Sequence, residues 1–413
     1  MLTRMQEVRQ SLHSSPIRDI PGVIKQEIGK SKLYDRIRPS DEIAITAGSR
    51  GIARIDEILK SIVDELHAFG AVPFLVPAMG SHGGATVEGQ LEILKELNIT
   101  EASLGAPIRS SMEVVQITKT TTGQPVFLDK YASKAQAIIV VGRIKPHTDF
   151  RGPIESGLSK MMTIGLGKHK QASFVHQYGS CGMRELIPQF ASAIIANAPI
   201  ALGIAIIEDG YHQPAVIEAV EPEEILEREV ELLQEAWRLM PLLPFDALDV
   251  LVVDWIGKEI SGTGMDTNVI GRLMIHGEKE FEKPRIEVIV ARDLTPASHG
   301  NAVGLGLADI VTRNLVDKID FETMYRNAIT STFLERAKIP FIAETDREAI
   351  KIALKICGNP VLSEVRMARI KSTLDLDRLY ISESLVAEAV ENPTLELVGK
   401  PREMRFKSSG ELL

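Results

Sequence analysis

The sequence predicts an α/β protein of two domains, each with a largely parallel sheet flanked by helices, and an active site in the interdomain cleft. Two observations predict this class. Short apolar segments alternate with segments of helical periodicity along the chain of 413 residues. Glycine-rich turns follow the early apolar segments, as they do where strands lead into helices. The composition, 44% hydrophobic and 25% charged, is that of a globular protein and excludes a disordered or fibrous one.

The first half of the chain carries the clearest strand and helix signals. Its apolar runs predict strands over Glu42–Thr46, Val72–Val76, Ala137–Val141 and Ile200–Ile207. Helical spacing of apolar residues predicts helices from Ile55 to Gly70, over about Thr86–Leu97, over about Met183–Ala196 and over Glu223–Leu239. Between Gly142 and about Gly167, polar residues and glycine predict a long loop.

Pro241 and Pro244 interrupt this pattern, and a new apolar strand begins at Leu248. We therefore expect a domain boundary near residue 245, with domains over 1–245 and 246–378. A tail over 379–413 is expected to pack on the N-terminal domain. The second domain should contain strands at Leu248–Val253 and Ile286–Val290, a helix from about Val303, and a strand–helix unit from Pro340 to Cys357.

Three loops with polar side chains follow predicted strands. They are Gly48-Ser49-Arg50, Gly80-Ser81-His82 and Lys145-Pro146-His147. Ligands of open α/β sheets bind outside the carboxyl ends of the strands. We therefore expect these loops to meet at one edge of the sheet and to form the binding site.

Charge and cysteine content narrow the function classes. A net charge of −9 argues against a dedicated nucleic-acid binder or a membrane-surface protein. Cys181 and Cys357 are too few for a disulfide framework or a structural zinc site, so we expect reduced thiols. Charges recur through the first thirty residues, and the longest apolar runs are far shorter than the roughly 18–20 residues that span a bilayer. We expect a soluble, cytoplasmic protein.

Several specific motifs are incomplete or absent. Gly165-Leu166-Gly167-Lys168 resembles a P-loop, but His169 stands where Ser or Thr is required and Met162 where the first glycine is required. Gly262-Thr263-Gly264 lacks the third glycine of a dinucleotide fingerprint. No GxSxG elbow and no HExxH zinc helix occurs in the sequence. These absences weaken the common NTPase and hydrolase interpretations.

Three histidines and two basic residues in or near the strand-end loops can carry chemistry. The imidazoles of His82, His147 and His176 can take up and return a proton near pH 7, or bind a metal. Lys160 has apolar neighbours that favour a nucleophilic amine, and Arg50 opens a helix where an anion can bind. Taken singly, each side chain is equally compatible with an ordinary turn or surface position.

Taken together, these residues resemble the lactate racemase family, the nickel-pincer-dependent 2-hydroxyacid racemases and epimerases. The resemblance extends over much of residues 40–205 and more loosely over the second domain. The sixteen-residue spacing of Lys160 and His176 matches that of the family's cofactor lysine and nickel histidine. His82 stands in the family's Gly-x-His, at the end of the second predicted strand.

The resemblance implies an isomerase whose N-terminal domain, 1–245, binds the cofactor. That cofactor is a pyridinium-3,5-bisthiocarboxylic acid mononucleotide-type nickel pincer, which the resemblance attaches covalently to Lys160. His176 would complete the nickel coordination, Arg50 would lie near the cofactor phosphate, and His82 and His147 would act as acid and base. The implied partners are a small 2-hydroxyacid substrate and cofactor-synthesis proteins, with no nucleic acid and no membrane.

Departures from the family pattern indicate a divergent subgroup. Ala47 replaces an acidic residue before the arginine, and Leu158-Ser159 replaces Gly-Arg before the lysine. The second domain also carries its own run, from Gly257 to Asp266. Two alternatives therefore stay open. His82, His147 and His176 could bind a metal for a hydrolase or lyase reaction, or the chain could be a non-catalytic mononucleotide-binding relative.

Overall fold

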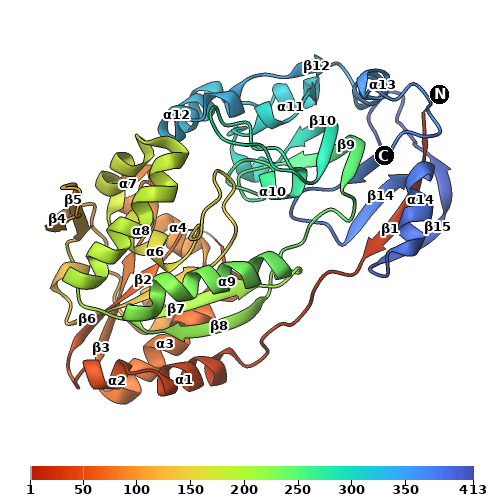
Figure 1. The fold of residues 1–413 in the computed structure, drawn as a ribbon. Helices are drawn as coiled ribbons and strands as arrows, with labels where there is room; N and C mark the ends of the chain where they lie inside the picture. Colours follow the sequence, from red (N-terminus) through yellow and green to blue (C-terminus); the bar gives the residue numbers. More distant parts are fainter. Residues whose placement is uncertain (1, 50) are drawn as a thin grey trace. The chain divides into compact units, whose positions relative to one another are not determined.

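The computed structural model describes residues 2–49 and 51–413, and they divide into two compact units. The N-terminal unit is His13–Met240. The C-terminal unit combines the residues up to Leu12 with Pro241–Leu413. Helices flank the sheet of each unit, which confirms the α/β class (Figure 1).

The N-terminal unit is built on a five-stranded sheet of order β3-β2-β6-β7-β8. Its strands are β2 (Glu42–Ala47), β3 (Val72–Pro77), β6 (Ala137–Arg143), β7 (Ile200–Glu208) and β8 (Pro214–Val220). The first four are parallel, and β8 pairs with β7 antiparallel. A separate hairpin joins β4 (Val114–Lys119) and β5 (Pro125–Asp129). The four parallel strands are those that the apolar runs predict.

Helices cover both faces of this sheet. They are α1 (Ile20–Lys30), α2 (Leu33–Arg36), α3 (Ile55–Phe69), α4 (Val87–Glu96), α5 (Glu101–Leu104), α6 (Leu158–Lys160), α7 (Lys168–His176), α8 (Gly179–Asn197) and α9 (Ile225–Leu239). Short 3₁₀ turns occur at η1 (Gly83–Ala85), η2 (Ala132–Lys134) and η4 (Pro222–Glu224), and a π-helix at η3 (Met161–Gly165).

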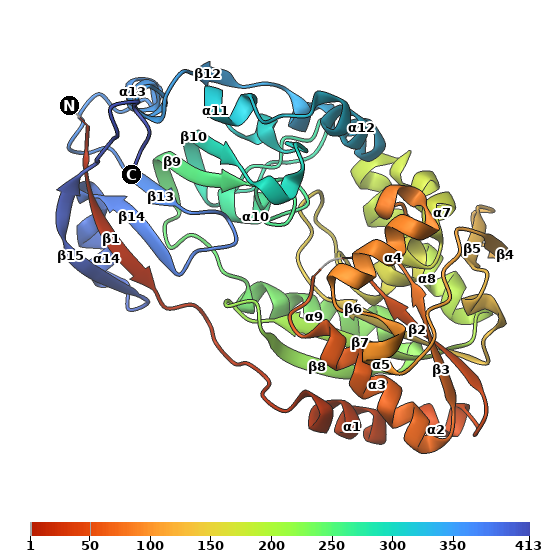
Figure 2. The same cartoon turned by 180° about the vertical axis from the view of Figure 1, so that it is seen from behind.

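Alternate residues of the strands supply the two cores of this unit. Ile43 and Ile45 of β2 pack with the apolar residues of α1 and α3 on one face (Figure 2). Ala44, between them, packs on the other face with α8 and α9. This alternation is the two-residue period of a strand. It fixes the register of the parallel strands, whose carboxyl ends therefore lie at the same edge of the sheet.

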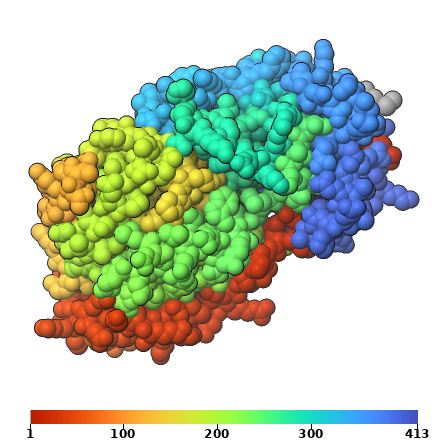
Figure 3. All heavy atoms as spheres, in the orientation of Figure 1, coloured from red at the N-terminus to blue at the C-terminus, as the bar shows by residue number. Residues whose placement is uncertain are grey.

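The segment expected to be a loop up to Gly167 becomes helical earlier, at Leu158. Leu158 and Met162 are wholly buried in the core that faces α8 and α9, so burial of apolar surface favours helix here over the glycine signal. The turn then widens into η3, and π-helical turns are frequent at functional sites. Upstream, the loop after β6 reaches the molecular surface on the face drawn in Figure 3 (yellow).

The C-terminal unit contains an eight-stranded mixed sheet of order β12-β11-β10-β9-β13-β14-β1-β15. Its strands are β1 (Arg4–Gln10), β9 (Ala247–Ile256), β10 (Arg285–Leu294), β11 (Ile310–Thr312), β12 (Phe341–Ala343), β13 (Met367–Ile370), β14 (Arg378–Ser382) and β15 (Leu395–Glu403). The five strands from β12 to β13 are parallel, and β14, β1 and β15 extend the sheet antiparallel.

The helical elements of this unit are mostly short. They are α10 (Thr267–Ile270), α11 (Arg313–Val316), α12 (Phe321–Ser331), α13 (Asp346–Ile356), α14 (Val386–Glu391), η5 (Pro296–Ser298), η6 (Leu305–Leu307), η7 (Leu334–Ala337) and η8 (Glu383–Leu385). The helix expected from about Val303 is limited to η6. Gly304 has φ of +104°, and a Cβ there would lie 1.6 Å from the Thr263 carbonyl oxygen, so the chain turns sharply where a helix would begin.

The two ends of the chain pair with each other inside the C-terminal unit. Strand β1 pairs with both β14 and β15. The tail after Leu379 thus packs on the first residues of the chain, which belong to this unit and not to the N-terminal one. The compact units differ from the expected ranges 1–245, 246–378 and 379–413 at both ends of the chain, and they divide between Met240 and Pro241, close to the expected residue 245. A strand's partner is set by long-range contacts, which local periodicity does not report.

No helix among the described residues is both long and apolar enough to cross a bilayer. Cys181 is exposed, Cys357 is buried, and both are free thiols.

Candidate active site

The ends of β2 and β3 pack directly on η3, the segment that follows Lys160. A Cβ on Gly48, just after β2, would lie 3.0 Å from the Met161 Cε. Gly80, just after β3, has φ of +59°, and a Cβ there would lie 2.9 Å from the Ile164 Cγ2. The Gly80 N–H also donates to the Gly165 carbonyl at 3.4 Å. The glycines let the strand-end backbones touch η3, so these loops and Lys160 share one edge of the sheet.

Lys160 contacts His147, which follows β6. The Lys160 Nζ lies 2.5 Å from the His147 Nε2, and the Asp149 backbone N–H donates to the His147 Nδ1 at 3.0 Å. A neutral imidazole carries one proton, so a ring whose Nδ1 accepts must carry that proton on Nε2. The Lys160 amine is therefore in direct hydrogen-bonding contact with the second ring nitrogen of a held imidazole. This arrangement presents Lys160 as a nucleophile.

His176 ends α7 and is half-buried. Burial lowers the pKa of His176, a charge on Lys160 lowers it further, and the Asp149 carboxylate opposes both. The ring is therefore neutral at pH 7, which is the form that binds a transition metal. The electrostatic influence of Lys160 and Asp149 on His176 brings it into the group formed by His147 and Lys160.

His82 is exposed in the loop after β3. Its Nδ1 is hydrogen-bonded to the Ser49 Oγ, so the loops after β2 and β3 meet through this pair. Beneath them, the Gln90 Nε2 donates to the carbonyls of Gly80 at 3.2 Å and of His82 at 3.4 Å. The carboxamide thus holds the backbone on both sides of Ser81. Arg50, the expected phosphate partner, lies outside the described residues.

Glu155 holds the backbone at His147. Its carboxylate accepts the N–H of His147 at 2.5 Å and that of Gly152 at 3.2 Å, and the Arg151 guanidinium lies 3.6 Å away. Burial raises the pKa of Glu155, and these donors act against that rise. Sequence analysis does not single out this residue, because a lone glutamate in a loop gives no local signal.

Glu229 holds the turn before Lys160 from α9. It is 2% exposed, and it accepts the Ser159 N–H at 3.1 Å and the Ser159 hydroxyl. Burial raises the pKa of Glu229 to about 7 against these hydrogen bonds. A sequence signal does exist here. Glu229 falls on the apolar face of α9, four residues after Ile225 and three before Leu232, both of which are buried.

A buried ion pair supports the loop that carries His82. Lys168 and Asp129 are both fully buried, with Nζ 3.3 Å from Oδ2. The Lys168 Nζ also donates to the Pro77 carbonyl at the end of β3 and to the Gln90 Oε1 at 3.4 Å. Lys168 is the lysine of the incomplete P-loop motif. Its amine is committed to the protein interior, so the motif serves a structural purpose here.

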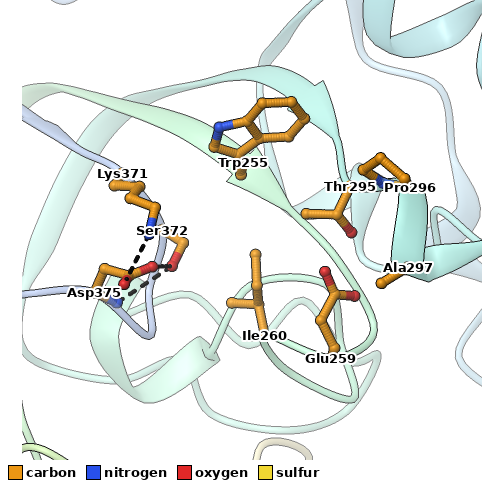
Figure 4. A pocket seen from close by; sticks show the side chains of 9 residues that line it. All are labelled: Trp255, Glu259, Ile260, Thr295, Pro296, Ala297, Lys371, Ser372 and Asp375. Carbon is orange, nitrogen blue, oxygen red and sulfur yellow. Dashed lines mark hydrogen bonds and ion pairs between the residues drawn. The ribbon is translucent and has the colours of Figure 1, made fainter.

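Within residues 2–49 and 51–413, no group of three or more His, Cys, Asp or Glu side chains is arranged to hold a metal ion. The C-terminal unit has an open pocket of about 440 Å³ at the carboxyl ends of β9, β10 and β13 (Figure 4). Trp255, Ile260 and Pro296 give it apolar walls, and Lys371 pairs with Asp375 at 3.1 Å on its rim. The pocket lies where the strand order reverses around β9, the usual ligand position in such sheets.

Comparison with known proteins finds one family model and similar solved structures. Residues 3–182 match the model of the lactate racemase N-terminal domain, a range that contains all five candidate residues. The lactate racemase apoprotein from Thermoanaerobacterium thermosaccharolyticum has a similar fold, with 15% identity, a TM-score of 0.52, and coverage of 87% of this chain and 93% of that one. A Thermotoga maritima protein shows 14% identity and a TM-score of 0.48 over 68% of this chain and 72% of its own. No curated protein matches the chain.

We predict that Lys168→Met destabilises the protein by about 3–5 kcal/mol, because it leaves the Asp129 carboxylate buried without its cation. Urea unfolding followed by circular dichroism measures the change. The double variant Lys168→Met/Asp129→Leu should recover part of the loss. Lys170→Met, at an exposed position on the same helix, is the control. A double variant no more stable than Lys168→Met would contradict the assignment of an energetic pair.

We predict that Glu229 makes stability fall as pH rises. Its folded pKa of about 7 lies above the ordinary value of 4.5, so the unfolded chain ionises first between these two pH values. The free-energy cost of keeping ionised Glu229 buried in the folded protein is absent below pH 4.5 and complete above pH 7. It amounts to roughly 3 kcal/mol. The unfolding free energy of Glu229→Gln minus that of the wild type should rise across this window. A difference that stays flat with pH would refute the assignment.

Proposed function

Because residues 3–182 match the lactate racemase N-terminal domain, we propose that the chain is an isomerase that racemises or epimerises a 2-hydroxyacid with a nickel-pincer cofactor. The observation that carries this proposal is the 2.5 Å contact between the Lys160 Nζ and the His147 Nε2, with His176 close enough to respond to a charge on Lys160. A nucleophilic amine, an acid–base imidazole and a ligand imidazole are the three groups that the family chemistry requires.

The residues present fit such a cofactor. Lys160 offers a primary amine in contact with an imidazole, and an amine is what a covalent attachment through nitrogen needs. His176 offers a neutral imidazole, a ligand that suits nickel alongside soft sulfur and carbon donors. A pincer supplies the remaining donors itself, so a single protein ligand completes the coordination. Such a cofactor therefore requires one amine and one imidazole from the chain, and the charge of Lys160 reaches the His176 ring.

The other residues of the site orient the imidazoles and transfer the proton of the substrate hydroxyl. When bound, the cofactor supplies a hydride acceptor, which spares the enzyme from deprotonating a weakly acidic C–H. We assign His147 and His82 to the proton of the substrate hydroxyl, one for each enantiomer. His147 is held by Glu155 and Asp149, and His82 by Ser49 and the backbone that Gln90 fixes. Each imidazole therefore has a defined orientation before substrate binds.

We predict that Lys160→Ala abolishes covalent attachment of the cofactor without unfolding the protein. The wild type, co-expressed with cofactor-synthesis proteins, should show a mass increase on the Lys160 peptide and one nickel per chain. Intact mass spectrometry and metal analysis measure both. His82→Asn is the control: it should keep the adduct and the nickel but lose about 10²–10⁴ in turnover. An adduct on Lys160→Ala, or none on the wild type, would refute the proposal.

We predict that racemisation in D₂O leaves the hydrogen on C2 of the 2-hydroxyacid unexchanged. In a hydride mechanism that hydrogen leaves and returns as hydride, whereas a general base would exchange it with solvent. Proton NMR of the recovered substrate and product measures the deuterium content at C2. Full deuteration of the product would show proton abstraction and would contradict the hydride assignment. Lactate, and 2-hydroxyacids with larger side chains, are the substrates to compare.

A further inference from the structure

Glu229 is a buried carboxyl group that the proposed chemistry does not use. It lies on α9, where Glu227 and Glu231 are exposed. Within the part of the chain that the structure describes, no lysine, arginine or histidine forms an ion pair with Glu229. Burying a carboxylate without a cation is costly, so its retention on the apolar face of a helix calls for a specific task.

All of its hydrogen bonds go to the turn that precedes Lys160. Both carboxylate oxygens accept the Ser159 N–H, at 3.1 and 3.2 Å, and one of them also accepts the Ser159 hydroxyl. The Leu158 N–H donates to the same carboxylate. Glu229 therefore satisfies the backbone donors that α6 leaves unpaired at its start, which the chain must satisfy in some way because Ser159 is fully buried.

The shape of the turn is fitted to this carboxylate. A Cβ on Gly157 would lie 2.0 Å from the Glu229 Oε1 and 2.6 Å from the Ile144 Cδ1. No side chain fits there while Glu229 keeps its position. Gly157, Ser159 and Glu229 thus form one close-packed group, with Lys160 as the next residue after it.

Lys160 is held from two sides. On the α9 side, Glu229 fixes the backbone from which its side chain extends. On the β6 side, Glu155 fixes the backbone of His147, whose ring contacts the Lys160 Nζ. A displacement of either backbone by a few tenths of an ångström would lengthen the contact between Nζ and Nε2.

From these contacts we propose that Glu229 is a positioning residue for Lys160: with Ser159, it holds the turn that keeps the Lys160 amine on the His147 Nε2 and so keeps it nucleophilic. The proposal deepens the function proposed above, since it concerns the same lysine. It is nevertheless testable on the chain without cofactor, through the reactivity of the amine itself.

The test measures acetylation of Lys160 by acetic anhydride across pH 6–9 in the full-length chain, with peptide mass spectrometry resolving each lysine. The titratable groups around Lys160 are His147, which contacts it, and His176 and Glu155, whose pKa values respond to its charge. Asp149 and Arg151 lie beside these groups, and all five are unchanged in every variant. Glu229→Gln removes the charge, Ser159→Ala removes only the hydroxyl donor, and Glu227→Gln makes the same chemical change at an exposed position of α9.

We expect Glu229→Gln to move the Lys160 acetylation profile upward by about one pH unit, which is about a tenfold loss of rate at pH 7. Ser159→Ala should cause a smaller shift in the same direction, because the N–H contact remains. The double variant should shift no further than Glu229→Gln, since both changes act through one contact. Glu227→Gln and the other lysines should match the wild type.

An unchanged Lys160 profile in Glu229→Gln and Ser159→Ala would overturn the proposal, and a lowered melting temperature without a shift would assign Glu229 a purely structural role. If Glu229→Gln does not fold, Ser159→Ala decides alone. The result is separable from the proposed function. A shifted profile in a chain that never acquires an adduct or nickel would keep the positioning role and refute the cofactor. An adduct on a chain with no shift would do the reverse.

Discussion

The packing of η3 against the ends of β2 and β3 is the constraint on which the rest of the site depends. Gly48 and Gly80 have no side chains where Met161 and Ile164 approach, so the strand-end backbones and the helical segment share a surface. This packing fixes the position of the backbone at Lys160. The contact between the Lys160 Nζ and the His147 Nε2 then relates the position of the His147 ring to it. Protein interiors are close-packed, so a methyl group added at Gly80 would displace η3. That displacement would reach Lys160, because close packing leaves no space to accommodate it locally.

Buried charge has a common purpose across the N-terminal unit. Glu229, Glu155 and the Lys168–Asp129 pair each hold backbone groups of a different loop: the turn at Ser159, the turn at His147, and the end of β3 at Pro77. None of them is optimal for stability, because desolvation opposes the charged form of each. What these buried groups provide is a fixed geometry of the loops. Loops joined to buried charged acceptors and donors have few alternative conformations, which is what an ordered set of catalytic side chains requires.

The sequence predicts the parts of this molecule that depend on local pattern. The four parallel strands of the N-terminal unit and helices such as α3 follow from apolar periodicity alone. The pairing of β1 with β15 does not, because no local signal specifies a partner almost four hundred residues away. The same division holds at the site. Lys160 and His176 are proposed from a spacing that resembles the family's, whereas Glu155 and Glu229 act through contacts that only the folded chain creates.

The contact between Lys160 and His147 also orders the two tasks assigned to His147. While Nε2 contacts the lysine amine, it is not available to a substrate hydroxyl. A cofactor held covalently at Nζ, as proposed above, would change that amine and leave Nε2 to the substrate, while Asp149 and Glu155 still hold the ring and its backbone. Under the proposed function, the chain without cofactor therefore keeps one of its two acid–base groups engaged, and loading the lysine is what frees it.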